Sequence, residues 1–385
     1  MNYLVTEFCG LGNFILSLPA IQNLSGTESK NNITVVGNDK YSGLKIAKHV
    51  DQINNIINLN KIKFTKKLLF YWNVITGKYQ VLIIFSNSNP EFIFLLFSYL
   101  FVREKIVQPY FFKSTSHPIV IFFLNSIVSL RKKLNKKFSV VNVHDIYEDT
   151  HEIEANNVLI NHLQPNSTYQ IIKKPQLEYN YNEDTLKKFK LKKNNYVVLQ
   201  TISSSGNITP KNWKLEHNMM LIKKFNEAKL NLVLIGEKSE YFFGLMNEKP
   251  LLIKSFIQDF QYVKNIMGKT NINDIIDILH FSNGIICLDS GIMHLGDAID
   301  KKLIALFGPT DVKKNYVKGK NSLIINRQLE CAPCLKGWSF PGSIALNEAQ
   351  AVVRCKIEFK CMSSITPDEV FEKACNFFEL HSSKA

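Results

Sequence analysis

The sequence predicts an α/β protein built from two doubly wound, Rossmann-like domains. Its 385 residues and 45% hydrophobic content supply enough apolar side chains for two cores of ordinary size. Short apolar runs alternate with amphipathic segments along the whole chain, which favours parallel strands connected by helices. A stretch rich in Asn, Lys and Pro at 164–182 is typical of a linker. We therefore expect domains over 1–165 and 193–365, joined by a linker over 166–192.

The expected strands are short apolar runs bounded by turn-forming residues, as in buried parallel sheets. In chain order they lie at Val5, 33–36, 56–59, 81–85 and 105–108 in the first half, and at 197–201, 232–235, 285–288 and 303–307 in the second. A last helix is expected over 366–385. Thr366 suits its N-cap, Pro367 suits its first helical position, and acids follow in the first turn.

The formal net charge of +14 comes mainly from lysine. One interpretation is attraction to an acidic partner, either an anionic membrane face or an anionic glycan. The other is a lysine-rich composition without a selected binding surface. The sequence has no zinc-finger spacing, no RNP-type aromatic motif and no basic helix with interleaved aromatics. Nucleic acid is therefore not an expected partner.

The amino-terminal residues contain an acid, Glu7, and no basic lead, so we expect no secretory signal and a cytoplasmic protein. Two apolar runs, 92–102 and 118–130, are shorter than the roughly 18 to 20 residues that cross a bilayer. They indicate buried helices or a surface that touches lipid, as in peripheral contact with an inner membrane.

The most informative stretch runs from Ser282 to Asp311. It indicates a buried strand, a tight turn at 289–291, a short helix and a second strand. The turn follows the first strand, where N–H groups at the start of the next helix favour a diphosphate or another anion. Residues 289–294, Asp-Ser-Gly-Ile-Met-His, closely resemble the nucleotide-sugar signature Asp-Ser/Thr-Gly-x-Met-His of the ADP-heptose:lipopolysaccharide heptosyltransferases, glycosyltransferase family 9. Residues 306–311, Leu-Phe-Gly-Pro-Thr-Asp, resemble the segment that follows this signature.

The resemblance implies the GT-B architecture, in which two Rossmann-like domains face each other. The amino-terminal domain would bind the acceptor, the carboxyl-terminal domain would bind the nucleotide sugar, and the terminal helix would return to the first domain. The residues that the resemblance assigns to the donor are Thr201, Lys211, Glu240, Asp289, Ser290, Gly291, Met293 and His294.

Three of these assignments have a plainer alternative. Lys211, close to Trp213, is similar to the loop lysine that meets the donor phosphates, although a loop lysine is commonly just solvated. Glu240, slightly preferred to Glu237 in the same turn, is similar to the acid that accepts hydrogen bonds from the ribose hydroxyls, although acids also stabilise an exposed helix start. His294 matches the donor-site histidine, although an isolated histidine is commonly packed in a core.

The amino-terminal turn departs from the family pattern. Gly10 and Gly12 resemble its acceptor-side Gly-x-Gly, which permits close backbone approach to a ligand. Asn13, however, stands where the family has its general-base Asp. An amide cannot usefully accept a proton near neutral pH, although Asn13 could still orient the acceptor. Glu7 is the nearest carboxylate in the sequence that could replace the base. Further candidates for the base are Asp145 and His117.

Four cysteines in the loop over 331–361 have a spacing that suits a metal. Cys331 and Cys334 form one pair, and Cys355 and Cys361 form a second, so four thiolates could close around one structural zinc or iron ion. The resemblance extends to these cysteines, since in a branch of the family that modifies bacterial adhesins similar cysteines hold a metal. The alternative is reduced, packed thiols, because a cytoplasmic compartment disfavours disulfides.

The resemblance implies an inverting glycosyltransferase that needs no cofactor for catalysis. It would move a sugar, heptose from ADP-heptose, to a lipopolysaccharide-core or related glycan acceptor. One alternative is a catalytically inactive homologue that binds sugar nucleotides, which Asn13 favours. Others are a protein heptosyltransferase that acts on an adhesin and a UDP-sugar epimerase of the related two-domain type, which the spacing of the signature disfavours.

Overall fold

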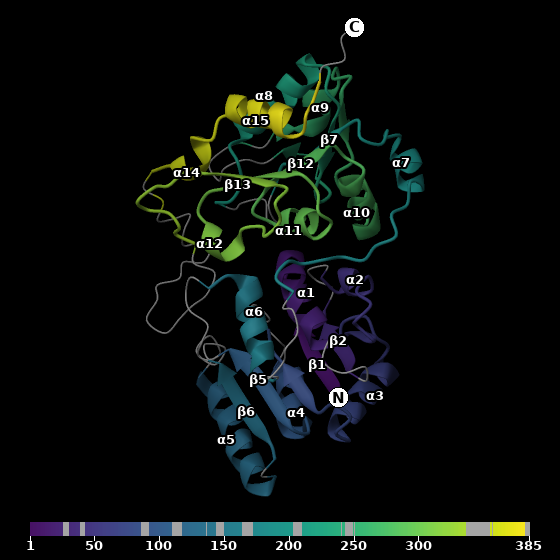
Figure 1. Ribbon diagram of the computed structural model, residues 1–385, viewed down its shortest axis with the longest axis vertical. Helices are drawn as coiled ribbons and strands as arrows, with labels where there is room; N and C mark the ends of the chain where they lie inside the picture. The colour runs from purple at the N-terminus through teal and green to yellow at the C-terminus, as the bar shows by residue number, and fades with distance from the viewer. Residues whose placement is uncertain are drawn as a thin grey trace. The chain divides into compact units, whose positions relative to one another are not determined.

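The computed structural model describes residues 1–25, 31–38, 43–85, 92–109, 118–135, 137–143, 150–163, 172–202, 210–239, 241–242, 249, 251–335, 355 and 357–381. These residues form two compact units, of which unit 1 is Met1–Glu178 and unit 2 begins at Tyr179 (Figure 1). Among the helices of these segments, none has the length and hydropathy of a membrane span.

Unit 1 contains a six-stranded sheet in which all neighbouring strands are parallel. Its strand order is β3-β2-β1-β4-β5-β6, which is the doubly wound order of a dinucleotide-binding fold. The strands are β1 (Asn2–Glu7), β2 (Asn32–Gly37), β3 (Asn55–Asn58), β4 (Val81–Ile83), β5 (Lys105–Pro109) and β6 (Ser139–Val143).

Helices in unit 1 form two groups, as a parallel sheet that is buried on both faces requires. The first group is α1 (Leu11–Ser25), α2 (Gly43–Ala47) and α6 (Glu152–Asn161), in which α1 packs against the other two. The second group is α3 (Phe64–Ile75), α4 (Phe92–Phe101) and α5 (Pro118–Leu134), which pack in a row. Because strand side chains alternate between faces, Leu4, Leu82 and Ile106 all join the core under α3, α4 and α5.

Unit 2 repeats this plan with a second parallel sheet of order β11-β8-β7-β12-β13-β14. Its strands are β7 (Val197–Gln200), β8 (Leu232–Ile235), β11 (Val263–Asn265), β12 (Gly284–Leu288), β13 (Leu303–Phe307) and β14 (Ser322–Asn326). A separate antiparallel pair joins β9 (Tyr241–Phe242) to β10 (Leu251–Leu252). The helices are α7 (Asp184–Phe189), α8 (Leu215–Glu227), α9 (Ile253–Ile257), α10 (Ile272–His280), α11 (Gly291–Ala298), α12 (Val312–Asn315), α14 (Lys360–Ser363) and α15 (Pro367–Phe377).

The two parallel sheets confirm the predicted α/β class with two Rossmann-like domains. The strands β6, β11 and β14 of the two parallel sheets were absent from the strands expected from the sequence, as were the short strands β9 and β10 of the separate pair.

The three missed strands of the parallel sheets all lie at the edge of a sheet, and most of their residues are only half-buried. An edge strand has fewer neighbours, so its sequence lacks the continuous apolar run that marks a central strand.

Unit 2 begins at Tyr179, earlier than the boundary at 193 that we expect from the sequence. The reason is α7, which lies inside the predicted linker yet packs against α10. Asp277 of α10 is buried and accepts hydrogen bonds from the backbone N–H of Asn182 at 2.9 Å and from Oγ1 of Thr185 at 2.7 Å. These bonds hold the second half of the predicted linker in unit 2.

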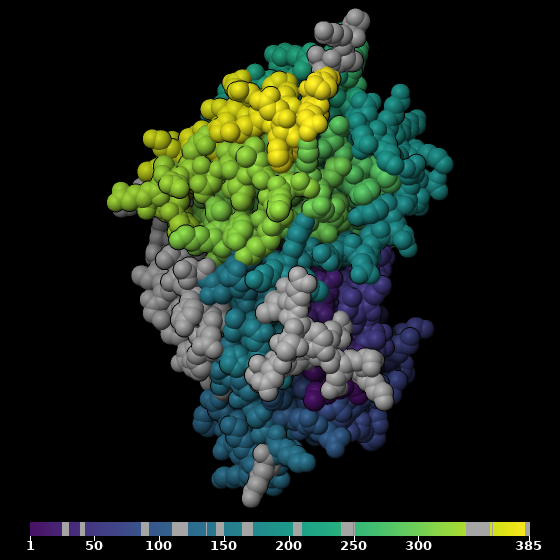
Figure 2. Space-filling view, viewed as in Figure 1, coloured from purple at the N-terminus to yellow at the C-terminus, as the bar shows by residue number. Residues whose placement is uncertain are grey.

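The terminal helix α15 starts behind Thr366, whose side chain accepts a hydrogen bond from the N–H of Glu369. The helix packs against α8 and contributes to the core of unit 2. Trp213, which is fully buried, donates from Nε1 to the carbonyl of Ile365 at 2.9 Å and ties this segment down. Figure 2 shows the segment in yellow against the green surface of unit 2.

Candidate functional site

The carboxyl ends of β7 and β12 form the switch point of the unit 2 sheet. The two strands are neighbours, and the chain continues from β7 toward β8 on one side and from β12 toward β13 on the other. Open α/β sheets bind ligands in the crevice where the strand order reverses in this way. Gln200 and Thr201 lie at the end of β7, and Asp289 and Ser290 follow β12. The fold thus brings two predicted donor segments to one sheet edge.

Ser290 joins the two strand ends. Its Oγ donates a buried hydrogen bond of 2.6 Å to Oε1 of Gln200. Ser290 is also the N-cap of α11, but its side chain makes no capping bond there, and the first turn of α11 holds no acid. The first N–H groups of a helix have no intrahelical acceptor, and they form the positive end of its dipole. The start of α11 therefore suits an anion.

Lys211 provides a cation at the same place. Its Nζ lies 3.3 Å from Oδ2 of Asp289, whose side chain is 6% exposed, whereas the side chain of Lys211 is 24% exposed. The carboxylate is thus held inside the fold, and the ammonium group lies nearer the solvent. An anionic ligand at this edge would meet the lysine without displacing the carboxylate from the core.

Two buried hydroxyls lie at the same edge. Oγ1 of Thr201, after β7, and Oγ1 of Thr310, after β13, have no hydrogen-bond partner within the described residues. Buried polar atoms are almost always hydrogen-bonded, so each of these two oxygens is able to bind a partner from outside the described residues. Thr310 was not among the predicted site residues. Its position in the Gly-Pro-Thr-Asp segment was the sequence feature that could have indicated it. In this segment Asp311 caps α12 by accepting a hydrogen bond from the N–H of Lys313.

The remaining signature residues lie on α11. Gly291 is its first residue, and His294 is buried one turn later, where its N–H approaches the carbonyl of Ser290 at 3.4 Å. Met293 is fully buried in unit 2, so its side chain contributes packing in this conformation. Glu240 lies outside the described residues.

Residues 268–270, Gly-Lys-Thr, pack against the glycine turn after β8. Gly268 has φ +70° and donates from its N–H to the carbonyl of Gly236 at 3.0 Å. A Cβ on Gly268 would lie 2.5 Å from Cα of Lys238, so only glycine allows this approach. The segment holds the turn that precedes Glu240.

The amino-terminal turn of unit 1 connects β1 to α1. Gly12 and Asn13 are half-buried in the first turn of α1. A Cβ added to Gly10 would meet no atom within 4 Å, so the backbone there is open to close approach. Glu7 is fully buried, and a Cβ on Gly43 would lie 1.9 Å from its Oε1. Its carboxylate therefore packs inside unit 1. Asp145 and His117 lie outside the described residues.

A second carboxylate near this turn was missed in the sequence. Glu152 is buried at the start of α6, next to His151, whose Nδ1 accepts from the N–H of Ile153 at 3.2 Å. Removal from water and then the carboxylates of Glu7 and Glu152 raise the pKa of Cys9 well above its ordinary value. The two acids therefore lie near one thiol beside the turn. The sequence signal that could have indicated Glu152 is the His-Glu pair at the start of a helix.

The four predicted metal-ligating cysteines are neighbours. Burial raises the pKa of Cys361 to about 12, and charge on Cys334, Cys355 and Cys331 acts in the same direction. The N–H groups of Cys334 and Leu335 both donate to the carbonyl of Pro309, which fixes this loop beside the end of β13. Across the part of the chain that the structure describes, however, no three His, Cys, Asp or Glu side chains are placed to hold a metal ion. The tetrahedral zinc or iron site expected from the spacing is not supported.

Comparison with known proteins identifies relatives of this chain. The model of glycosyltransferase family 9 (heptosyltransferase) matches residues 127–341, which is more than half of the sequence. Lipooligosaccharide heptosyltransferase 2 of Campylobacter jejuni is 26% identical over 200 residues, which cover 50% of this chain and 56% of the relative. Lipopolysaccharide heptosyltransferase 2 of Escherichia coli K12 is 27% identical over 100 residues, which cover 26% of this chain and 28% of the relative. The chain thus spans about half the length, or less, of the curated relatives that it matches.

Solved structures share the fold of this chain. The ADP-heptose lipopolysaccharide heptosyltransferase II of E. coli superposes with a TM-score of 0.62 at 14% identity and covers 98% of this chain and 99% of its own. A family 9 glycosyl transferase of Veillonella parvula gives 0.66 at 14% identity, with 98% and 97% covered. The iron-containing heptosyltransferase TibC, in complex with ADP-D-β-D-heptose, gives 0.58 at 10% identity, with 98% and 76% covered.

Proposed function

Because this chain belongs to glycosyltransferase family 9, we propose that it is an inverting glycosyltransferase that moves heptose from ADP-heptose, or a close ADP-sugar, to a lipopolysaccharide-core or related glycan. The observation that carries the proposal is the group at the switch point of unit 2. There Lys211 lies beside Asp289, α11 begins, and the buried hydroxyls of Thr201 and Thr310 lie at the same edge. The names of the relatives support the choice of donor and acceptor.

In the proposed reaction an acceptor hydroxyl attacks the anomeric carbon of the donor sugar in line with the leaving group. The new C–O bond forms as the bond from that carbon to the diphosphate oxygen breaks, so the configuration at the carbon inverts. The hydroxyl proton passes to a base, and ADP leaves with the bonding electron pair. Negative charge grows on the diphosphate, and stabilising that charge is the main electrostatic task.

The proposed partners of this charge are Lys211 and the backbone N–H groups of 291–293. Charge-assisted hydrogen bonds to a diphosphate are stronger than neutral ones, and the start of a helix adds its dipole. His294, on the same helix, is proposed to contact the donor, and the Glu240 carboxylate is proposed to accept from the ribose hydroxyls. No metal is needed in this scheme.

The proposed base is a carboxylate of unit 1, because the amide of Asn13 cannot accept a proton usefully. Glu7 and Glu152 are the candidates near the amino-terminal turn, since both influence the thiol of Cys9. Both side chains are buried, so an acceptor would reach either one only after the turn moves. In this scheme Asn13, Gly10 and Gly12 position the acceptor.

The proposed cellular location follows from the two substrates. A nucleotide sugar is a cytoplasmic donor, and a lipopolysaccharide-core acceptor is anchored in the inner membrane. We therefore propose a cytoplasmic enzyme that meets its acceptor at the membrane surface. The competing possibility is an inactive homologue that binds sugar nucleotides, which the amide at position 13 favours.

The decisive experiment combines binding and transfer. Calorimetry with ADP-heptose, a GDP-sugar and a UDP-sugar should show binding of ADP-heptose, and a transfer assay with a lipopolysaccharide-core acceptor should yield the heptosylated product. Asn13→Asp should transfer at least as fast as the natural chain, because general-base assistance typically contributes about 10² to 10⁴ in rate. Asn13→Ala is the matched control, since it removes the amide and adds no base.

Two outcomes would change the assignment. If the natural chain and Asn13→Asp both bind ADP-heptose and neither transfers heptose to a glycan or an adhesin, the chain is an inactive sugar-nucleotide-binding homologue. If a UDP-sugar binds and ADP-heptose does not, the proposed donor is wrong.

A further inference from the structure

Helix α3 exposes an apolar stripe on the surface of unit 1. Phe64, Leu68 and Trp72 follow one another at intervals of four residues, and the side chain of Trp72 is 61% exposed. The opposite side of the same helix supplies Phe70 and Val74 to the core under the sheet. An amphipathic helix needs only one apolar face to pack in a domain, so the second apolar face calls for another explanation.

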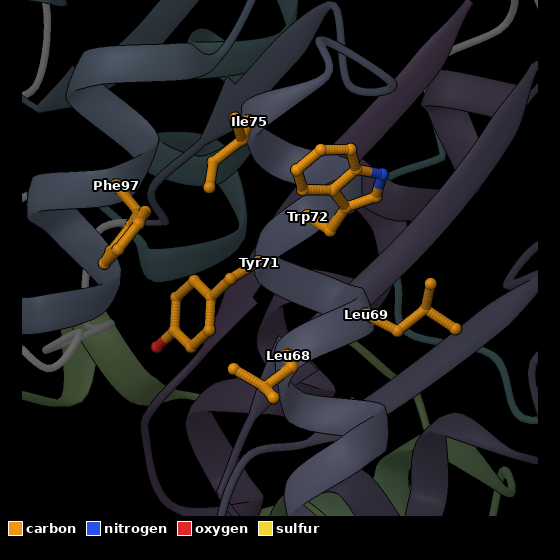
Figure 3. Close-up of a pocket in the computed structure, with 6 residues that line it drawn as sticks. All are labelled: Leu68, Leu69, Tyr71, Trp72, Ile75 and Phe97. Atoms are coloured by element: carbon orange, nitrogen blue, oxygen red, sulfur yellow. The ribbon is translucent and has the colours of Figure 1, made fainter.

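The stripe borders an apolar hollow between α3 and α4. The hollow has a volume of about 520 Å³ (Figure 3). Tyr71 and Phe97 stand together on one side of it, with ring centroids 4.7 Å apart. Its lining residues are Leu68, Leu69, Tyr71, Trp72, Ile75 and Phe97. Aromatic and aliphatic side chains therefore form the lining of the hollow.

The apolar surface continues onto the two neighbouring helices. Because α3 packs against α4 and α4 packs against α5, the three helices form one layer. The other large apolar side chains exposed on this layer are Phe92 and Ile93 on α4, and Phe122, Phe123, Leu130 and Leu134 on α5. We call the exposed surface of α3, α4 and α5 the three-helix face. Exposed apolar residues that occur singly need no explanation, but a group over three adjacent helices marks an interaction surface.

The same stretch of sequence carries most of the net positive charge of the protein. Residues 52–144, about a quarter of the chain, contain thirteen Lys and Arg and only two acids, so they hold eleven of the fourteen net positive charges. Lys61, Lys63 and Lys66 are exposed at the start of α3, and Lys132 and Lys133 are exposed at the end of α5. The lysines thus flank the apolar residues at both ends of the layer.

We propose that the three-helix face docks on the surface of an anionic lipid bilayer. Exposed Trp, Phe and Leu side chains bury their apolar parts at the boundary between head groups and acyl chains, and Trp and Tyr favour that interface. Lysines beside them are attracted by the negative surface potential of anionic lipids. The combination of a broad apolar surface and one sign of charge favours a membrane over a protein partner, whose surface charges are mixed. The docking rests on unit 1 alone and does not depend on the proposed donor.

The test is flotation of the full chain with vesicles. We expect binding to vesicles that mix phosphatidylglycerol with phosphatidylcholine, and at least tenfold weaker binding to phosphatidylcholine alone. Trp72→Ser and the double variant Lys63→Glu/Lys66→Glu should each weaken binding to the anionic vesicles at least tenfold. All substituted side chains are exposed, so both variants should fold. The matched control is Lys254→Glu/Lys320→Glu, which makes the same charge change at exposed positions of unit 2 and should bind vesicles far better than the unit 1 double variant.

Two results would overturn the docking surface. One is equal binding of the natural chain, Trp72→Ser and both double variants to the anionic vesicles. The other is a stable dimer of the natural chain in light scattering that Trp72→Ser dissociates, because a second copy would then cover the face. Calorimetry of ADP-heptose with Trp72→Ser separates this inference from the proposed function, since donor affinity should equal that of the natural chain whether or not vesicles bind.

Discussion

At the scale of single residues, the pairing of Lys211 with Asp289 defines the candidate site. The carboxylate is almost fully buried and the ammonium group is partly exposed, at 3.3 Å from it. An ion pair of this kind holds the long lysine side chain over the sheet edge. Because the side chain is already ordered, ligand binding costs less rotamer entropy.

Replacing Lys211 by Ala should weaken the binding of ADP by about 1.5 to 3 kcal/mol, the scale of a hydrogen bond to a charged group. Calorimetry with ADP measures this change directly. Lys214→Ala is the matched control, because Lys214 lies three residues along and pairs with the exposed Glu216. An unchanged dissociation constant in Lys211→Ala would contradict the assignment of this lysine to the donor phosphates.

Motif spacing was enough to predict that the turn at Asp289 follows a buried strand. It could not predict the hydrogen bond from Ser290 to Gln200, because that bond depends on which strands are neighbours in the sheet. The sequence also could not indicate which charged side chains are buried. Glu152 and Lys314 are almost fully buried, although both residue types are usually exposed and their burial depends on elements distant in the sequence.

At the scale of elements, the hydrogen bond from Ser290 to Gln200, here called the joint between β7 and β12, both supports the sheet and shapes the site. This bond uses the side chain that would otherwise cap α11, so one residue links two strands and leaves the start of the helix for a ligand. Central strands and the helices between them were predictable from their apolar periodicity. The edge strands β6, β11 and β14 were not, and neither was α7, whose place is fixed by contacts with Asp277.

Replacing Ser290 by Ala should lower the free energy of unfolding of unit 2 by about 1 to 3 kcal/mol, because Oε1 of Gln200 would remain buried without its donor. Urea titration followed by tryptophan fluorescence reports on this unit when Trp72 and Trp338 are replaced by Phe, which leaves the buried Trp213 as the only tryptophan. Ser255→Ala removes an exposed serine bond to the carbonyl of Leu252 and should change stability by less than about 0.5 kcal/mol. Equal effects of the two substitutions would show that the joint adds no stability.

At the scale of the whole molecule, each unit has its own sheet and its own core, and charge is divided unequally between different parts of the chain. The parallel order of both sheets was predictable from the alternation of strands and helices. The exposed apolar layer was not, because the runs at 92–102 and 118–130 fit a buried helix equally well, and only the structure shows which side chains reach the surface.

Unit 2 should lose stability as pH falls below about 6.5, the ordinary pKa of histidine. Burial, and then Lys301 and Lys193, lower the pKa of His280, whose ring stacks on Tyr181. Between the lowered and the ordinary pKa the unfolded chain binds a proton that the folded chain does not, so stability falls with falling pH. The midpoint of thermal unfolding at pH 7.5 and at pH 5.5 measures this loss.

His280→Phe keeps an aromatic ring against Tyr181 and removes the titrating group, so this variant should lose less stability between the two pH values. His381→Phe, at an exposed position, is the control and should behave like the natural chain. The same loss in all three proteins would rule out His280 as the source of the acid sensitivity.

The three-helix face also governs how copies of the protein behave toward one another in solution. Two copies that meet through this face bring clusters of lysine together. At low ionic strength the repulsion between these lysines opposes the apolar attraction, and the protein stays in solution without associating. Added salt shortens the Debye length to about 8 Å at 0.15 M and to about 3 Å at 1 M. The electrostatic repulsion between the lysine clusters is then screened, whereas the apolar attraction remains. Aggregation should therefore increase under the salt conditions that weaken adsorption to an anionic surface. A low-salt buffer is the natural choice for concentrating this protein.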